Sequence, residues 1–432
     1  MASVINLDPT HVAPGNTVLG QAIKHIGIGK HGSKPLPADL LEACRQALTD
    51  PNTHPLQRGA FIGALLAKGP TEAELTLESA IGKDAFRHPT FLIQKLCTDL
   101  HAGLLPIAVR LVRGHTLSVS EAEQLGDYLF GNEPCEAFRG FAASIMRVRH
   151  ETNDEYLGLM RAAERTFTPG FRLNQTVSER PLVQLAEPFD GVEHSYMITP
   201  LLANWFERRG YGALSMVGRS GGPKLTLNAH DLYMHLGCQY MQSRHELTEP
   251  LMPYGWVLDQ KALSPALNRW VDRRQVLLKR PFLATLEKVL NPCGARILVT
   301  SVFHITYQMK MAELALMAGF DAAIVMKRGL EGTLAPATSR ASGVLCAVRT
   351  AQGHLFFQNF EADRPEFTSF RTDEDPDVPN PTAADNAALI RKFVAQKVTG
   401  DEHFDNRVRY AYALMERGME WIEGQLKVPP VK

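Results

Sequence analysis

A glycine-rich turn with two cations is one stretch of this sequence whose residue types could do chemistry. The segment 218-GRSGGPK-224 follows a short apolar run, precedes a helical pattern, and carries Arg219 and Lys224. Backbone N–H groups at such a turn, together with the positive end of the next helix, attract anions. It is no Walker P-loop, because Pro223 interrupts the required Gly-Lys pair. The pattern fits a phosphate or carboxylate subsite, and it equally fits a structural turn between a strand and a helix.

A second turn gathers acidic groups. In 187-EPFDGVEHSY-196, the side chains of Asp190, Glu193 and His194 lie close together in the chain between a strand pattern and a helix pattern. Carboxylates there would bind ribose hydroxyls or help to hold Mg²⁺. Asp and Gly are also common in turns because they favour turn conformations, so the alternative is that these residues only shape the turn.

Positive charge is concentrated in the stretch 269-RWVDRRQVLLKR-280. Its cations are Arg269, Arg273, Arg274, Lys279 and Arg280. A charge run of this size is usually a solvated helix face. The alternative is a site for an anionic ligand or for a nucleic-acid backbone.

The last candidate, 326-MKRGLEGTLAP-336, places Lys327, Arg328 and Glu331 at the end of a predicted strand. Ligands of open α/β sheets bind at the carboxyl ends of strands, so these side chains are well placed for function. The sequence contains no H-E-x-x-H. Zincin chemistry is therefore not indicated.

The elements that must position these residues change character near residue 171. Residues 37–165 show apolar positions at helical spacing, whereas short apolar runs bounded by Gly and Pro alternate with helical patterns afterwards. We expect strands at 181–186, 213–217, 296–302 and 322–327, and helices at 199–210, 229–237, 281–290 and 305–319. This alternation predicts β-α-β units and a mainly parallel sheet, with a hairpin over 343–361 that turns at Gln352-Gly353.

The helical part contains a repeat. The segment 58-RGAFIGALLAKGPTEAEL-75 recurs as 139-RGFAASIMRVRHETNDEY-156, and helix-like stretches at 39–50 and 121–132 precede the two copies. Small residues at matching positions predict closely approaching helices. We interpret the pair as a duplicated helical module, with chance similarity as the alternative.

Composition limits the classes of protein that this chain can belong to. Its 432 residues include 46 Lys+Arg and 46 Asp+Glu, so the formal net charge is zero, which disfavours coating nucleic acid through global charge. Six separated cysteines without a C-x-x-C pair indicate neither a disulfide framework nor a zinc knuckle. With no signal-peptide pattern and no apolar run of the roughly 18–20 residues that a membrane span needs, we expect a cytoplasmic protein without a membrane partner.

Taken together, these stretches resemble the anthranilate phosphoribosyltransferase family, glycosyltransferase family 3. The strongest pieces are 139–156, 199-TPLLANWFERRGY-211, 229-AHDLYMHLG-237 and 264–292, which ends on Asn291-Pro292. The resemblance implies an α/β fold with a helical domain that dimerises, a larger α/β domain, and a pentose or phosphoribosyl ligand. We predict an additional helical module at 1–103, the family's helical domain at 104–172 and the α/β domain at 173–432.

The motifs that the family uses for its donor are eroded in this chain. Its G-T-G-G-D becomes 188-PFDGV-192, its K-H-G-N becomes 216-MVGR-219, and its tandem Asp-Glu becomes Glu331-Gly332. Gly191 alone keeps a glycine of the first motif, and one carboxylate in the last would hold Mg²⁺ weakly. The chain is more similar to a divergent branch of the family that has been linked to nucleic-acid binding.

Two hypotheses follow. The first is a glycosyltransferase that transfers or binds a pentose or phosphoribosyl group of a phosphorylated small molecule, as a homodimer, with an altered donor or acceptor site. Its predicted phosphate and ribose contacts are Asp190, Gly191, Gly218, Arg219, Lys224 and Thr226. Its acceptor or anion contacts are Arg269, Arg273, Arg274, Lys279 and Arg280, and Glu331 is the candidate Mg²⁺ ligand. The second is a non-catalytic nucleic-acid-binding protein on the same fold.

Overall fold

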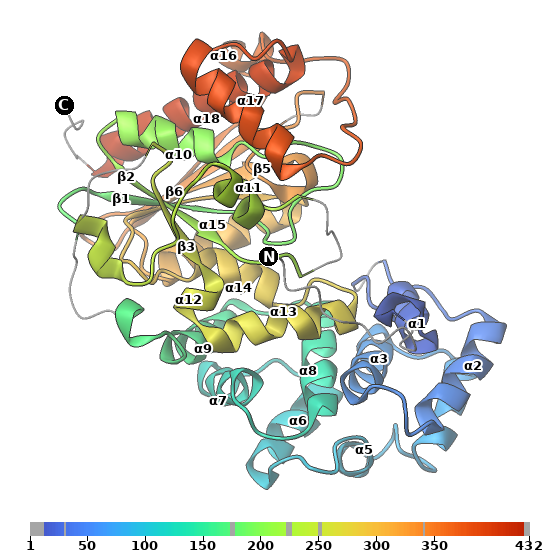
Figure 1. Cartoon of the computed structure of the whole chain (residues 1–432). Helices are drawn as coiled ribbons and strands as arrows, with labels where there is room; N and C mark the ends of the chain where they lie inside the picture. The colour runs from blue at the N-terminus through green and yellow to red at the C-terminus, as the bar shows by residue number, and fades with distance from the viewer. Residues whose placement is uncertain are drawn as a thin grey trace. The chain divides into compact units, whose positions relative to one another are not determined.

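A computed structural model describes residues 13–29, 32–172, 178–221, 227–248, 253–339 and 342–426. The chain forms two compact units. The first comprises Met1–Leu159 and Asp272–Leu283, and the second comprises Met160–Val271 and Ala284–Lys432. The predicted fold class is confirmed, because one unit is helical and the other is built on a sheet flanked by helices (Figure 1). The finer division at residues 103 and 172 remains a prediction.

The first unit contains only helices in its described residues. They are α1 (Val18–Ile26), α2 (Ala38–Thr49), α3 (Pro55–Lys68), α4 (Glu72–Leu75), α5 (Pro89–Leu96), α6 (Leu105–Val112), α7 (Val119–Phe130) and α8 (Glu136–Arg149), with short 3-10 turns between them. Helices α9 (Asn153–Arg165) and α13 (Pro265–Leu277) each begin in one unit and end in the other.

Local signals explain where several of these helices begin. Thr71 and Glu74 form a reciprocal capping box at α4, and Ser118 and Glu121 form one at α7. Each box satisfies backbone donors that would otherwise lack partners at a helix start. Pro55 opens α3, where its fixed φ suits the first helical turn. Helices α2 and α7 match the predicted helices at 39–50 and 121–132 within one or two residues, so both predictions are confirmed.

The second unit is organised around a seven-stranded sheet with the order β3-β2-β1-β4-β5-β6-β7. The strands are β1 (Leu182–Ala186), β2 (Gly212–Val217), β3 (Trp256–Asp259), β4 (Ile297–Val302), β5 (Ala322–Lys327), β6 (Gly343–Arg349) and β7 (Leu355–Phe360). Strands β1 to β5 pair in parallel, and β6 and β7 pair antiparallel. The predicted strands and the hairpin at Gly353 are confirmed, whereas the sequence reading missed β3.

Helices cover both faces of this sheet. The remaining helices of the chain are α10 (Thr199–Arg208), α11 (Ala229–His235), α12 (Gln260–Leu263), α14 (Leu283–Val289), α15 (Gln308–Met317), α16 (Pro365–Thr368), α17 (Ala383–Gln396) and α18 (Glu402–Leu426). Helices α10, α17 and α18 lie on one side of the strands, and α14 and α15 lie on the other (Figure 1). No helix in the described residues combines the length and the apolarity that crossing a membrane requires.

Glycine allows the long helix α18 to approach the sheet. A Cβ at Gly418 would lie 2.9 Å from Ile324 Cδ1 of β5 and 3.2 Å from Cys346 Sγ of β6. Met415 and Met419 on the same helix are fully buried in the core between α18 and the strands. This packing fixes the sheet whose carboxyl edge carries the candidate site.

Candidate functional site

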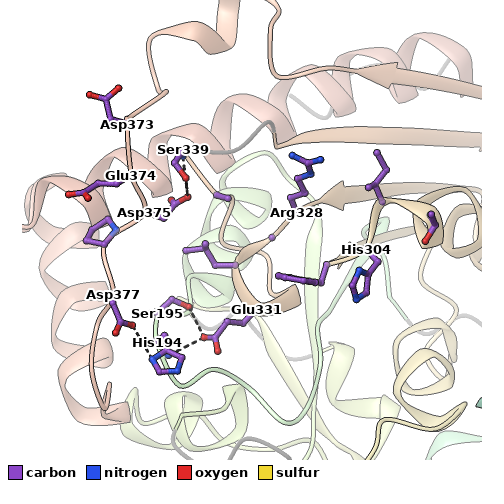
Figure 2. A pocket seen from close by; sticks show the side chains of 17 residues that line it. His194, Ser195, His304, Arg328, Glu331, Ser339, Asp373, Glu374, Asp375 and Asp377 are labelled. Carbon is purple, nitrogen blue, oxygen red and sulfur yellow. Dashed lines mark hydrogen bonds and ion pairs between the residues drawn. The ribbon is translucent and has the colours of Figure 1, made fainter. Parts of the chain in front are cut away.

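A cavity of about 960 Å³ lies at the carboxyl ends of the central strands (Figure 2). The loops that follow β1, β4 and β5 line it, together with residues 373–377. The strand order places β1 beside β4, with β2 and β3 on one side and β5 on the other. This is the topological switch point, where ligands of open α/β sheets bind.

Glu331 ties two of these loops together. Its Oε1 and Oε2 each lie 3.1 Å from the backbone N–H of Glu193, and Oε2 also accepts from His194 N at 3.1 Å and Ser195 Oγ at 3.2 Å (Figure 2). Three donors from the loop after β1 therefore occupy the carboxylate that follows β5. The fold therefore brings Glu331 and the turn 187–196 together, because both follow the carboxyl ends of strands of one sheet.

The donor set does not fit the predicted Mg²⁺ site. Both oxygens of Glu331 already accept hydrogen bonds from Glu193, and a Mg²⁺ ion would have to displace them. The described ranges contain no group of three or more His, Cys, Asp or Glu side chains that could hold a metal ion. We therefore derive no chemical step through Mg²⁺.

Arg328 supplies a cation to the cavity. Its φ of 55° is in the left-handed region, and its backbone is held by bonds to Val302 O at 2.9 Å and from Ser342 Oγ at 3.1 Å. Within the part of the chain that the structure describes, its guanidinium makes no ion pair and no hydrogen bond. A half-buried guanidinium with free donors in a cavity is suited to bind phosphate or carboxylate.

An acidic segment forms another wall of the cavity. Asp375 accepts hydrogen bonds from the backbone and the hydroxyls of Thr338 and Ser339, and it pairs with Arg407 at 3.2 Å. Burial raises the pKa of Asp375, but the hydrogen bonds from Ser339 and Thr338 outweigh it and lower the pKa to about 2. Nearby, Asp373 and Glu374 are exposed and belong to the lining of the cavity.

The sequence reading did not single out Glu187, which lies directly after β1. Its carboxylate is fully buried, accepts from the Thr199 hydroxyl at the start of α10, and accepts from Leu334 N at 3.0 Å. Burial raises the pKa of this carboxyl. The signal in the sequence is a carboxylate immediately after an apolar strand.

The two predicted phosphate loops meet each other closely. Gly191 has φ 69°, and a Cβ on it would lie 1.8 Å from Leu227 O, so only glycine fits there. A Cβ on Gly218 would lie 2.5 Å from the ring of Phe189, whose side chain is 3% exposed. The Phe189 ring therefore lies against Gly218, where the resemblance implied a backbone cradle for pyrophosphate. Asp190 is fully buried beside it.

Arg219 is engaged with a neighbouring helix. Its Nε donates to Asn268 Oδ1 at 3.1 Å, and its Nη2 donates to Asn268 O at 3.0 Å. Lys224 and Thr226 fall outside the described residues. The phosphate role of this turn therefore remains a prediction.

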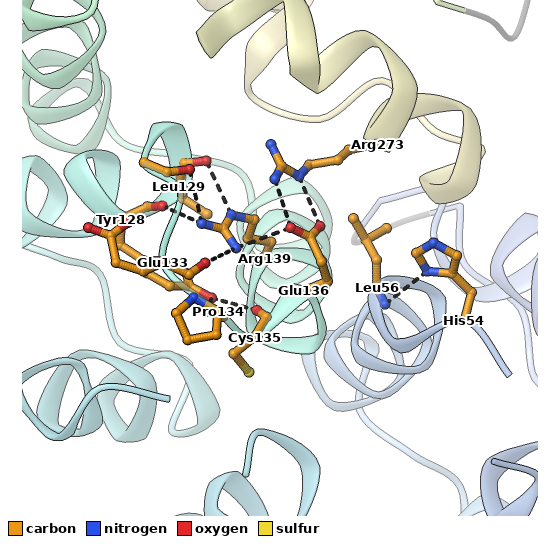
Figure 3. Close-up of polar contacts among 11 residues, drawn as sticks. His54, Leu56, Tyr128, Leu129, Glu133, Pro134, Cys135, Glu136, Arg139 and Arg273 are labelled. Carbon is orange, nitrogen blue, oxygen red and sulfur yellow. Dashed lines mark hydrogen bonds and ion pairs between the residues drawn. The ribbon is translucent and has the colours of Figure 1, made fainter. Parts of the chain in front are cut away.

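The basic stretch is not one solvated face. Arg274 is 1% exposed, and Arg273 donates to both carboxylate oxygens of Glu136 at 2.9 and 2.7 Å (Figure 3). Lys279 donates to Lys24 O at 3.3 Å, and burial lowers its pKa, with Arg147 and Lys24 lowering it further.

The remaining two cations differ in exposure and in location. Arg269 is exposed and belongs to the α/β unit, whereas Arg280 is half-buried in the helical unit. Nothing in the arrangement of the stretch supports the nucleic-acid alternative.

Comparison with known proteins identifies the fold. The crystal structure of anthranilate phosphoribosyltransferase from Thermus thermophilus matches with a TM-score of 0.54 and 20% identity, over 72% of this chain and 88% of that one. The chain shares the fold of this transferase. The yeast enzyme, from Saccharomyces cerevisiae, in complex with phosphoribosyl pyrophosphate and Mg, matches with a TM-score of 0.46 and 13% identity, over 89% of this chain and 88% of that one.

Sequence comparisons add little to this result. No family model matches the chain. An uncharacterized protein of Aquifex aeolicus (strain VF5) is 27% identical over 197 residues, which is 46% of this chain. The chain thus spans 57% of the length of that relative.

Proposed function

We propose that this protein binds, and transfers a group to or from, a pentose that carries a single phosphate. The observation that supports it is the Arg328 guanidinium, which is free of partners among the described residues and lies in a cavity at the topological switch point of a transferase fold. Arg328 binds the phosphate, and the carboxylates of Asp373 and Glu374 accept hydrogen bonds from pentose hydroxyls. The exposed side chains of Phe303 and Ile305, each 49% exposed, form an apolar wall for the acceptor.

A pyrophosphate–Mg²⁺ donor fits this site poorly. The Phe189 ring fills the space over Gly218, and the oxygens of Glu331 are committed to backbone donors. A donor with one phosphate needs neither feature. Within this proposal, catalysis rests on positioning the two substrates, and acidic groups near the pentose stabilise the positive charge that develops as its leaving group departs.

Calorimetric titration of the full chain tests the proposal. We expect ribose 5-phosphate or ribose 1-phosphate to bind without Mg²⁺, and ribose without phosphate to bind at least roughly tenfold more weakly, which is about 1.4 kcal/mol. Adding Mg²⁺ leaves the affinity unchanged. Absence of any heat with millimolar pentose phosphate would contradict the proposal.

Replacing Arg328 by glutamine is the matched test of the phosphate contact. Loss of a charged hydrogen bond to phosphate is expected to weaken binding by about 1.5–3 kcal/mol, while ribose affinity stays the same. Arg113→Gln, at an exposed position of the helical unit, is the control and leaves both affinities unchanged. Equal affinity of Arg328→Gln and wild-type protein for pentose phosphate would remove Arg328 from the site.

A further inference from the structure

The two helical copies repeat their polar contacts as well as their sequence pattern. Leu36 N donates to Glu74 Oε1 at 3.0 Å, and at the matching positions of the second copy Leu117 N donates to Glu155 Oε1 at 2.9 Å. The two carboxylates are 1% and 0% exposed. Each buried glutamate thus joins the start of its own copy to the end of that copy.

The partners of these two carboxylates also correspond. Lys68 pairs with Glu74 at 2.7 Å, and Arg149 pairs with Glu155 at 2.6 Å. Thr71 N and Thr152 N each donate to Oε2 of the glutamate three residues on, both at 2.8 Å. These side chains repeat across the copies at one constant spacing along the chain.

A buried arginine supports the second copy in the same way as its counterpart supports the first. Arg58 Nη2 donates to Asp50 O at 2.8 Å, and Arg139 Nη2 donates to Gly131 O at 3.2 Å, immediately after α2 and α7 respectively. Arg139 also donates to Tyr128 O at 3.0 Å (Figure 3). A guanidinium at the carbonyl end of a helix offsets the partial negative charge there.

The copies pack on one another through reciprocal contacts of α3 and α8. A Cβ on Gly59 would lie 1.8 Å from Ala137 O, and a Cβ on Gly140 would lie 1.9 Å from Leu56 O. Gly59 corresponds to Gly140 in the repeat, and Leu56 corresponds to Ala137. Each glycine therefore meets the residue equivalent to the one that its counterpart meets. Contacts in which i meets j and j meets i define an isologous, two-fold interface.

This interface is closed within the chain. The large side chains Phe61, Ile62, Phe138 and Phe141 on the two helices are all fully buried. A single copy with this face exposed would need a second subunit to cover it, because large apolar patches on monomers are rare. In this chain the second copy provides that cover.

We infer that the helical unit is a homodimer-type interface fused into one polypeptide, and that the protein is a monomer. The homodimer that the family resemblance implied is replaced by this internal pair. The segment 272–283 breaks the symmetry, since Arg273 binds Glu136 of the second copy while Val276 O accepts from Gln57 Nε2 of the first at 3.3 Å. One such segment serves both copies.

Sedimentation equilibrium of the full chain tests this inference. The expected mass is 47.9 kDa at every concentration across roughly a hundredfold range. A mass twice as large, at any of these concentrations, overturns the inference. This measurement uses unmodified protein, so it does not depend on whether a variant folds.

Thermal melts of glycine variants separate an internal pair from helices exchanged between two chains. Gly63→Ala, whose Cβ would lie 2.4 Å from Phe141 O, is expected to lower the melting temperature by the same amount at all protein concentrations. Gly424→Ala, with open space around its Cβ in α18, is the matched control and leaves the melting temperature unchanged or slightly higher. A melting temperature of the wild type or of Gly63→Ala that rises with concentration indicates exchanged helices and overturns the inference.

Discussion

Two non-glycine residues of the cavity, Arg328 and Glu331, have φ angles of 55° and 53°. Residues other than glycine, Asn and Asp rarely adopt positive φ angles of this size, and backbone strain of this kind is concentrated at functional sites. At Glu331 the hydrogen bonds from the loop after β1 hold the conformation, and at Arg328 the bonds of its backbone to β4 and to Ser342 hold it. The strained turn aims one cation into the cavity.

At the same scale, Asp375 predicts a pH dependence of stability. Its pKa is about 2 in the folded protein and 3.8 as its ordinary value, so the folded state binds the proton less tightly than the unfolded state. The stabilisation, about 2 kcal/mol, is fully present above about pH 4 and is lost as the pH falls toward 2. Asp375→Asn should lower the free energy of unfolding by this amount at pH 7 and flatten its fall between pH 4 and 2.

Urea denaturation at several pH values measures this effect. The control is Asp373→Asn, because that neighbouring carboxylate is exposed. If the free energy of unfolding falls equally for Asp375→Asn and for the wild type between pH 4 and 2, Asp375 does not cause the loss of stability at low pH.

At the scale of elements, the buried carboxylates of Glu74 and Glu155 hold each helical copy in shape. Removing one partner of a buried ion pair leaves an uncompensated charge, on Lys68 or Arg149, and the cost is about 3–5 kcal/mol. We expect Glu74→Ala and Glu155→Ala to lower the free energy of unfolding by similar amounts within this range. Equal effects at the two positions follow from the equal contacts of the copies.

Urea unfolding monitored by circular dichroism provides the measurement. Glu72→Ala, at an exposed position in the first turn of α4, serves as the control and should change the stability by less than about 1 kcal/mol. A large loss for Glu155→Ala with none for Glu74→Ala would show that the copies are not equivalent in energy.

At the scale of the whole molecule, charge balance governs which partners the protein attracts. The chain has 46 basic and 46 acidic residues. In the basic stretch 269–280, Arg274 is buried, Arg273 pairs with Glu136 and Arg269 is exposed. Binding to a nucleic-acid backbone needs several cations free to displace counterions. We therefore expect this stretch to give no non-specific binding to nucleic acid.

A mobility-shift titration with single- and double-stranded DNA checks this expectation. No complex should form at micromolar protein even at low salt, where phosphate contacts are strongest. A lysozyme sample, strongly basic, serves as a positive control for non-specific association. A shifted band that weakens steeply with added salt would restore the nucleic-acid hypothesis.

The sequence by itself determined the classes of element and their order. Apolar periodicity, glycines at helix ends and the Gly353 turn act over a few residues, so the helices, four of the five parallel strands and the hairpin were predictable. The repeat was likewise visible, because duplicated helices keep their spacing. The four-residue strand β3 was missed, since Trp256–Asp259 is too short to show a period.

Only the tertiary structure decided what each charged side chain does. Glu331 accepts hydrogen bonds from donors 136–138 positions earlier in the chain, Arg273 donates to Glu136, and the Phe189 ring contacts Gly218. The types of these residues predicted an open anion and metal site, but their partners come from distant segments that folding brings together. A carboxylate or guanidinium binds a ligand only if folding leaves its acceptors or donors free. Among the described residues, the Arg328 guanidinium meets this condition and the Glu331 carboxylate does not.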